Sequence, residues 1–172
     1  MDFARIAAIV VVMMACFTDM KSRRIPNVLT FGAAAGAMGY SLAAGGPAAM
    51  GWSFVGWLVG VAMFFPLFAL GGIGGGDVKL LAALGAWLGP GPTVWLALFS
   101  ALAGGPLALG LALVRGYARQ AFVNLWGLLS YWRVVGLRPH PGLTLESASA
   151  AVPRLPYSLP IAAGLLVTLW LH

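Results

Sequence analysis

Charged residues are scarce in this sequence. Its 172 residues include 10 Lys or Arg and 4 Asp or Glu, which together make up 8% of the chain. A soluble domain carries about 25% charged residues, whereas the apolar share here is 61% and the mean hydropathy is +0.94. Because so few polar side chains cannot cover a compact body in water, a water-soluble globule is excluded. The composition predicts an all-α protein that crosses a membrane several times.

Cysteine and histidine are scarce as well. Cys16 is the only cysteine, which excludes an intramolecular disulfide and a zinc site built on cysteine pairs. His140 and His172 lie far apart and belong to no HExxH motif, so a zinc protease is excluded. Residues 71–79 lack the Gly-Lys-Ser or Gly-Lys-Thr ending of a phosphate loop. A serine protease would have only Ser53 as a faint candidate nucleophile, and we expect neither a metal nor a cofactor.

The net charge of +6 does not indicate a nucleic-acid site. The cations are separated by long apolar runs and form no clustered basic stripe, which a nucleic-acid-binding surface would need. We therefore predict the lipid bilayer, and no nucleic acid, as the environment of the chain.

The uncharged runs predict six membrane-spanning helices. A helix needs about 20 apolar residues to cross a bilayer, and the uncharged runs cover residues 3–18, apart from Arg5, then 25–76, 80–114 and 155–171. The second run is divided by the turn residues 45–47 and the third by 89–92, both rich in Gly and Pro. The first run has no small-residue cleavage site after it, so we predict a retained anchor and a single membrane domain over 1–172.

The distribution of cations predicts the orientation of these helices. Loops on the cytoplasmic side of a membrane are enriched in Lys and Arg, and with six crossings only Arg5 falls on the opposite side. Both termini should therefore lie outside the cytoplasm. The nine cations of the predicted cytoplasmic side are Lys21, Arg23, Arg24, Lys79, Arg115, Arg119, Arg133, Arg138 and Arg154.

Two further features concern packing and the membrane surface. Gly56 and Gly60 form a GxxxG pair, as do Gly32 and Gly36, and such pairs let helix backbones approach closely.

The uncharged segment over 120–132 is too short to span the membrane, and its apolar residues recur at helical spacing. We predict an interfacial helix near 116–135 on the cytoplasmic face, followed by a loop over 139–154.

The acids are the most informative residues, because only Asp2, Asp19, Asp77 and Glu146 occur in the chain. Asp19 ends the first predicted span, and Asp77 follows a run of six residues that contains five glycines. The segment from Asp77 to Leu88 measures roughly 18 Å as a helix, short of a core of about 30 Å. Asp77 should therefore be recessed, with Asp19 just below the same surface. Acids at such depth usually face a polar cavity with a functional partner, which indicates a functional site. The alternative to a functional role is a solvated residue at position 19 and a helix N-cap at position 77.

These acids lie in motifs that resemble those of the type IV prepilin peptidases, which are intramembrane aspartic proteases of the GxGD class. The first motif is Asp19 followed by Ile25-Pro26-Asn27. The second is Gly74-Gly75-Gly76-Asp77-Val78-Lys79-Leu80. A third, weaker match is Leu155-Pro156-Tyr157, after which the family often has a small residue and this chain has Ser158.

The resemblance implies that Asp19 and Asp77 are a catalytic dyad that acts without a metal. The implied substrate is the leader peptide of a prepilin-like protein (a type IV pilin, pseudopilin or tight-adherence pilin), cut at the cytoplasmic boundary of its hydrophobic segment. The implied location is the prokaryotic cytoplasmic membrane, with the active site facing the cytoplasm. Larger members of the family add an N-terminal region with paired cysteines and an N-methyltransferase activity. The chain resembles the short, peptidase-only branch, and we expect no separate methyltransferase domain and no methyl transfer.

The other motif residues have expected supporting roles. The glycines around Gly74 and Gly76 would let a substrate backbone approach Asp77. Pro26 would keep Ile25 out of the helical region, and Asn27 would cap the second span. Lys79 would extend to the lipid headgroups or, alternatively, steer anionic groups.

Two other functions fit part of the same pattern. A preflagellin-type peptidase would share the chemistry and differ only in its substrate. A transporter or channel component could use Asp77 and Lys79 as a gate or proton relay, but this function does not explain Asp19 with Ile25-Pro26-Asn27.

Overall fold

The chain folds into α-helices, as the composition predicts. The computed structural model describes residues 2–69, 73–114 and 157–171, together with positions 116, 119, 123, 126, 127, 130, 131, 133 and 136. The helices are α1 (Phe3–Ser22), α2 (Asn27–Ala69), α3 (Gly75–Leu88), α4 (Pro90–Val114) and α6 (Ser158–Leu171). No strand occurs among these residues. The predictions of a helix near 116–135 and a loop over 139–154 lie largely outside the described residues.

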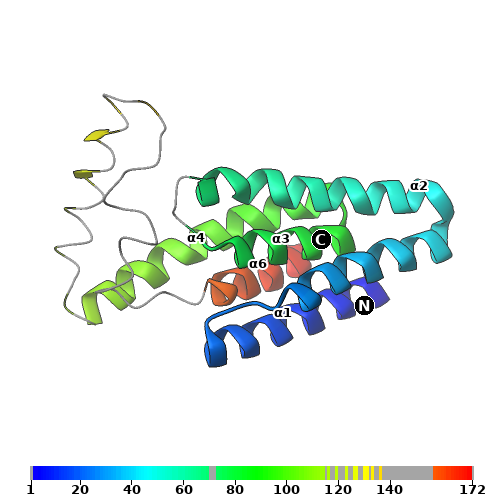
Figure 1. Ribbon diagram of the computed structural model, residues 1–172, viewed down its shortest axis with the longest axis horizontal. Helices are drawn as coiled ribbons and strands as arrows, with labels where there is room; N and C mark the ends of the chain where they lie inside the picture. Colours follow the sequence, from blue (N-terminus) through cyan, green and yellow to red (C-terminus); the bar gives the residue numbers. More distant parts are fainter. Residues whose placement is uncertain are drawn as a thin grey trace.

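Helix α2 consists of two arms that run in opposite directions. Gly46 has a φ of 72° and a ψ of −167°, which interrupts the helix, and Figure 1 shows α2 doubling back at this point. Gly89, with a φ of 80°, separates α3 from α4 in the same way. In both turns a proline follows the glycine and can begin the next helical segment, because its fixed φ suits the first helical position. The turns predicted at 45–47 and 89–92 are confirmed.

Among the residues that the structure describes, three helices are long and apolar enough to cross a membrane. They are α1, α2 and the Pro90–Leu111 part of α4, and the 43 residues of α2 provide the length for two crossings. Helices α3 and α6 have 14 residues each. Large apolar side chains, including Phe17, Met13 and Trp170, are exposed on the outside of the bundle, where lipid would cover them. A membrane protein is thus indicated, whereas six crossings and the side of the termini stay predictions.

Helix α3 lies at the centre of the bundle and contacts α1, α2, α4 and α6. Every residue from Leu80 to Ala86 is buried, and the apolar core joins α3 to Leu96 of α4 and Ile161 of α6. The second arm of α2 packs on α3 through Gly56 and Gly60, whose missing side chains leave room for the backbone of Gly85 and Ala82. The second GxxxG pair, Gly32 and Gly36, makes no such backbone contact.

The helix ends gather at two ends of the bundle (Figure 1). At one end, which we call the Asp19 end, the last turn of α1 meets the first residues of α2, α3 and α6. At the other, the Trp87 end, the start of α1 meets the end of α3, the start of α4 and the end of α6. Both sequence motifs therefore lie at one end of the molecule.

Candidate active site

Asp19 is buried near the end of α1. Its side chain and backbone are 8% exposed, and its Oδ2 accepts a hydrogen bond of 2.7 Å from the Oγ of Ser158, the first residue of α6. The alternative of a solvated residue at position 19 is therefore wrong. Helix α1 ends three residues later at Ser22, and its C-cap, Arg23, adopts a left-handed conformation with a φ of 52°. Asp19 thus sits one turn inside α1, facing α6.

Cys16 reinforces this contact from the preceding turn of α1. Its Sγ lies 3.4 Å from the backbone oxygen of Ser158 and donates a hydrogen bond to it. Residues three positions apart share one face of a helix, so Cys16 and Asp19 both point at the start of α6. Ser158 is therefore bonded to α1 twice: its carbonyl accepts from Cys16, and its hydroxyl donates to Asp19.

Asp77 occupies the third position of α3. The helix begins at Gly75 with Gly74 as its N-cap, and the backbone N–H of Gly74 donates a hydrogen bond of 3.1 Å to Asp77 Oδ2. The alternative of Asp77 as the N-cap residue is therefore wrong: the carboxylate folds back from inside the first turn. This position is favourable for a negative charge, because the first turn exposes unpaired N–H groups.

The two glycines of the second motif each make room for a different group. A Cβ at Gly74 would lie 3.0 Å from Asp77 Oδ2, so a side chain there would press on the carboxylate. A Cβ at Gly76 would lie 3.4 Å from the Cβ of Ile25, which is a tight contact. Gly76 therefore allows Ile25, from the first motif, to pack against the start of α3.

A hydrogen bond joins the two motifs a turn further on. Lys79 Nζ donates to Asn27 Oδ1 at 3.0 Å and also lies 5.5 Å from the centre of the Phe31 ring. Asn27 is the first residue of α2, and the carbonyl of Pro26 accepts from the N–H groups of Leu29 and Thr30. The prediction that Asn27 caps α2 is thus wrong, because Pro26 precedes the helix and the Asn27 side chain reaches α3. Lys79 therefore bonds to Asn27, a contact that was not among its expected roles at the lipid headgroups or in steering anionic groups.

The structure brings the two acids together at the Asp19 end. The carboxylates of Asp19 and Asp77 are close enough for an electrostatic interaction, and Tyr157, which precedes α6, lies within the same range of Asp77. Asp2 lies at the Trp87 end, and Glu146 is outside the described residues. No group of three or more His, Cys, Asp or Glu side chains that could hold a metal occurs within the described part of the chain. The arrangement offers a carboxylate pair, which is suited to acid–base chemistry.

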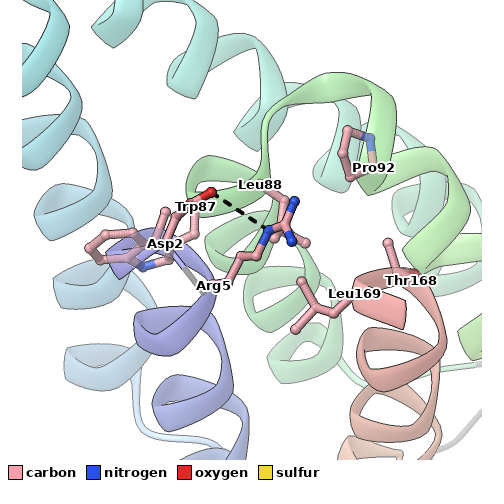
Figure 2. Close-up of a pocket in the computed structure, with 8 residues that line it drawn as sticks. Asp2, Arg5, Trp87, Leu88, Pro92, Thr168 and Leu169 are labelled. Carbon is pink, nitrogen blue, oxygen red and sulfur yellow. Dashed lines mark ion pairs between the residues drawn. The ribbon is translucent and has the colours of Figure 1, made fainter. Parts of the chain in front are cut away.

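A pocket of about 220 Å³ lies at the Trp87 end, and its lining includes neither Asp19 nor Asp77. The lining residues come from α1, α3, α4 and α6 and from Asp2 just before α1, and Figure 2 shows the side chains of Asp2, Arg5 and Trp87 around the pocket. Arg5 Nε lies 3.9 Å from Asp2 Oδ2, and Asp2 is exposed to solvent. An exposed ion pair of this kind contributes little to stability.

We expect the hydrogen bond between Lys79 and Asn27 to stabilise the contact between the start of α3 and the start of α2. In a double-mutant cycle of Asn27→Ala and Lys79→Ala, the two changes should be coupled by about 1 kcal/mol in the free energy of unfolding, because each removes the same hydrogen bond. Thermal unfolding of the four proteins in detergent measures this coupling. Strictly additive effects would show that the bond contributes nothing in solution.

Comparison with known proteins indicates the family of the chain. A model of the type IV leader peptidase family matches residues 6–109, which include both acids. The prepilin leader peptidase/N-methyltransferases of Aeromonas hydrophila and of Aeromonas salmonicida strain A449 are each 33% identical to the chain over 108 residues. The aligned part is 59% of this chain and 37% of each relative, so the chain spans little more than a third of their length. No solved structure matches the chain.

Proposed function

The chain belongs to the type IV leader peptidase family, and we propose that it is an intramembrane aspartic endopeptidase that removes the leader peptide of prepilin-like proteins. The observation that carries this proposal is the meeting of Asp19 and Asp77 at one end of the bundle, each with one carboxylate oxygen held by a neighbour. Acids are rare in the chain, and these two come from different helices. Such a pair supplies the base and the acid that peptide hydrolysis needs.

The proposed reaction uses the two carboxylates as a unit. Two carboxylates within interaction range do not both ionise readily, so the pair shares one proton. The ionised member takes a proton from a water molecule, whose oxygen attacks the carbonyl carbon of the scissile bond. The protonated member donates a hydrogen bond to the carbonyl oxygen. The tetrahedral intermediate then collapses, the C–N bond breaks, and the leaving nitrogen takes up a proton from the pair.

Gly74 supports access of a substrate backbone to Asp77. It presents no side chain beside the carboxylate, so an extended peptide can approach there, whereas Phe68 and Ile25 pack against Gly75 and Gly76. Ile25 and Asn27 keep the start of α3 against the start of α2. The segment that follows Asp19 therefore helps to hold the strip of backbone that leads to Asp77.

The charge distribution supports a site that faces the cytoplasm. Lys21, Arg23 and Arg24 follow Asp19 and are exposed, and Lys79 lies two residues after Asp77. Because Lys and Arg favour the cytoplasmic side of a membrane, we place the Asp19 end there, in the cytoplasmic membrane of a prokaryote. The leader would then be cut at the cytoplasmic boundary of the hydrophobic segment of its substrate.

The names of the Aeromonas relatives state two activities, leader peptidase and N-methyltransferase. We extend only the first to this chain, because a carboxylate pair provides what peptide hydrolysis requires. A preflagellin-type substrate would use the same pair, so only the identity of the substrate separates that alternative. A gate formed by Asp77 and Lys79 would instead predict solute flux without proteolysis.

Co-expression with a candidate prepilin tests the proposal. We expect the prepilin to lose its leader, with the mass of the shortened product marking the cleavage site. In detergent extracts the same cleavage should continue in the presence of a metal chelator, because the two carboxylates activate water without a metal.

Three controls interpret the result. A prepilin whose scissile bond is altered should stay intact, which excludes cleavage by other proteases. Loss of cleavage on chelation would point to metal chemistry. Transport of a solute by vesicles that contain the chain, without any prepilin cleavage, would favour the gate.

A further inference from the structure

Ser158 makes a contact that the family motifs do not explain. It is the first residue of α6, it is fully buried with an exposure of 0%, and its hydroxyl donates the 2.7 Å hydrogen bond to Asp19 Oδ2. The bond joins residues that are 139 positions apart. It is the only side-chain donor that the structure gives to either acid within the described residues.

The backbone around Ser158 is fixed as well. Cys16 Sγ donates to the Ser158 carbonyl from one turn before Asp19, and α6 packs on α1 and α4 immediately beyond. A side chain held at its backbone and buried on all sides has little freedom to turn away. The hydroxyl is therefore already in position before any substrate binds.

The two acids are then held in matching ways. Gly74 N–H holds Asp77 Oδ2, and Ser158 Oγ holds Asp19 Oδ2, so each carboxylate keeps its Oδ1 for the reaction. Among the described residues, the one fully enclosed polar side-chain atom without a partner is Trp87 Nε1, at the other end of the bundle. The remaining oxygens of Asp19 and Asp77 are thus not sealed off from water.

We propose that Ser158 is a positioning residue for Asp19: its hydroxyl fixes the carboxylate by Oδ2 and so keeps Oδ1 directed towards the reacting water. The inference rests on the proposed function for its catalytic meaning. The physical reason is that a general acid or base must lie within hydrogen-bond reach of the proton it transfers, and a buried donor of fixed position restricts the rotation of the carboxylate.

The deciding experiment follows the Asp19 carboxyl group by infrared difference spectroscopy of the full chain in lipid nanodiscs. In an Asp77→Asn background, the stretching bands of Asp19 are identified by their loss in Asp19→Asn. Adding Ser158→Ala should shift the frequency of these bands, because the carboxyl group loses the hydrogen bond at Oδ2. Ser158→Thr, which keeps the hydroxyl, should leave the bands near their original frequency.

The kinetics give a second readout. With Asp77 intact, Ser158→Ala should lower kcat for leader removal about tenfold and leave KM unchanged, and Ser158→Thr should restore kcat. Ser100→Ala is the matched control, because Ser100 is also fully buried but its hydroxyl bonds to Leu96 within α4. A loss of packing alone would lower kcat equally in Ser158→Ala and Ser100→Ala.

The outcomes separate this inference from the proposed function. An unchanged infrared frequency of Asp19 in Ser158→Ala would overturn the inference, even if wild-type protein removes leaders. A shifted frequency in a protein that cleaves no prepilin would support the contact between Ser158 and Asp19 while the proposed function fails.

Discussion

The Asp77→Asn variant should remove leader peptides at least about a thousandfold more slowly than wild type, and Asp19→Asn should lose a similar factor. General acid–base groups contribute about a hundredfold to ten-thousandfold to a rate, and a pair that acts as a unit loses most of its effect when either member is changed. Each variant leaves one carboxylate without the partner with which it shares a proton. The double variant should therefore be hardly slower than either single one.

Asparagine is the right replacement because the structure shows what each carboxylate does for the fold. The amide oxygen of asparagine can still accept from Gly74 N–H at position 77 and from Ser158 Oγ at position 19. The helices should therefore keep their places, and the loss should be in chemistry. Thermal unfolding of both variants should stay close to that of wild type.

Asp2→Asn is the matched control for these variants. Asp2 precedes α1, whose last turn carries Asp19, but it lies at the Trp87 end and is exposed. The change should leave leader removal unaffected, measured as the mass of the product in time courses with purified protein. Normal rates in either Asp19→Asn or Asp77→Asn would show that the dyad is assigned wrongly.

The fold was predictable from the sequence where the signal is local. Scarce charge indicated membrane helices, and the two turns were evident because Gly46 and Gly89 each precede a proline within an uncharged run. The start of α3 was misjudged, because Gly74 takes the N-cap position and leaves Asp77 inside the first turn. A glycine cap has no side chain that marks it in a sequence.

The site was predictable in its acids and not in their partners. Asp19 and Asp77 stand out because so few acids occur in the chain. Ser158 and the Asn27–Lys79 bond do not, because they join residues 139 and 52 positions apart, and no periodicity records such contacts. The sequence placed Ser158 only at the end of a third, weaker family match, and the packing of α1 against α6 gives it a role.

The largest effect on stability is expected at the glycines where α2 packs on α3. A Cβ at Gly60 would lie 2.6 Å from the Cα of Ala82 and 2.8 Å from the carbonyl oxygen of Leu81, and a Cβ at Gly56 would overlap the carbonyl oxygen of Gly85. These neighbours are backbone atoms of a buried helix and cannot turn aside. Gly60→Val should therefore lower the free energy of unfolding by about 3 kcal/mol or more, the upper range for overpacking.

The same change should also abolish leader removal, because α3 carries Asp77 and cannot shift without moving it away from Asp19. Gly51→Val is the control: Gly51 lies in the same arm of α2, and nothing lies within 4 Å of a Cβ built there. Valine is no worse than glycine within a helix, so this variant should unfold at the wild-type temperature and keep its activity. Equal thermal stability of Gly60→Val and Gly51→Val in nanodiscs would show that α2 and α3 do not pack through these glycines. A stable but inactive Gly60→Val protein would instead mean that α3 moves as a unit, carrying Asp77 out of reach of Asp19 without unfolding the bundle.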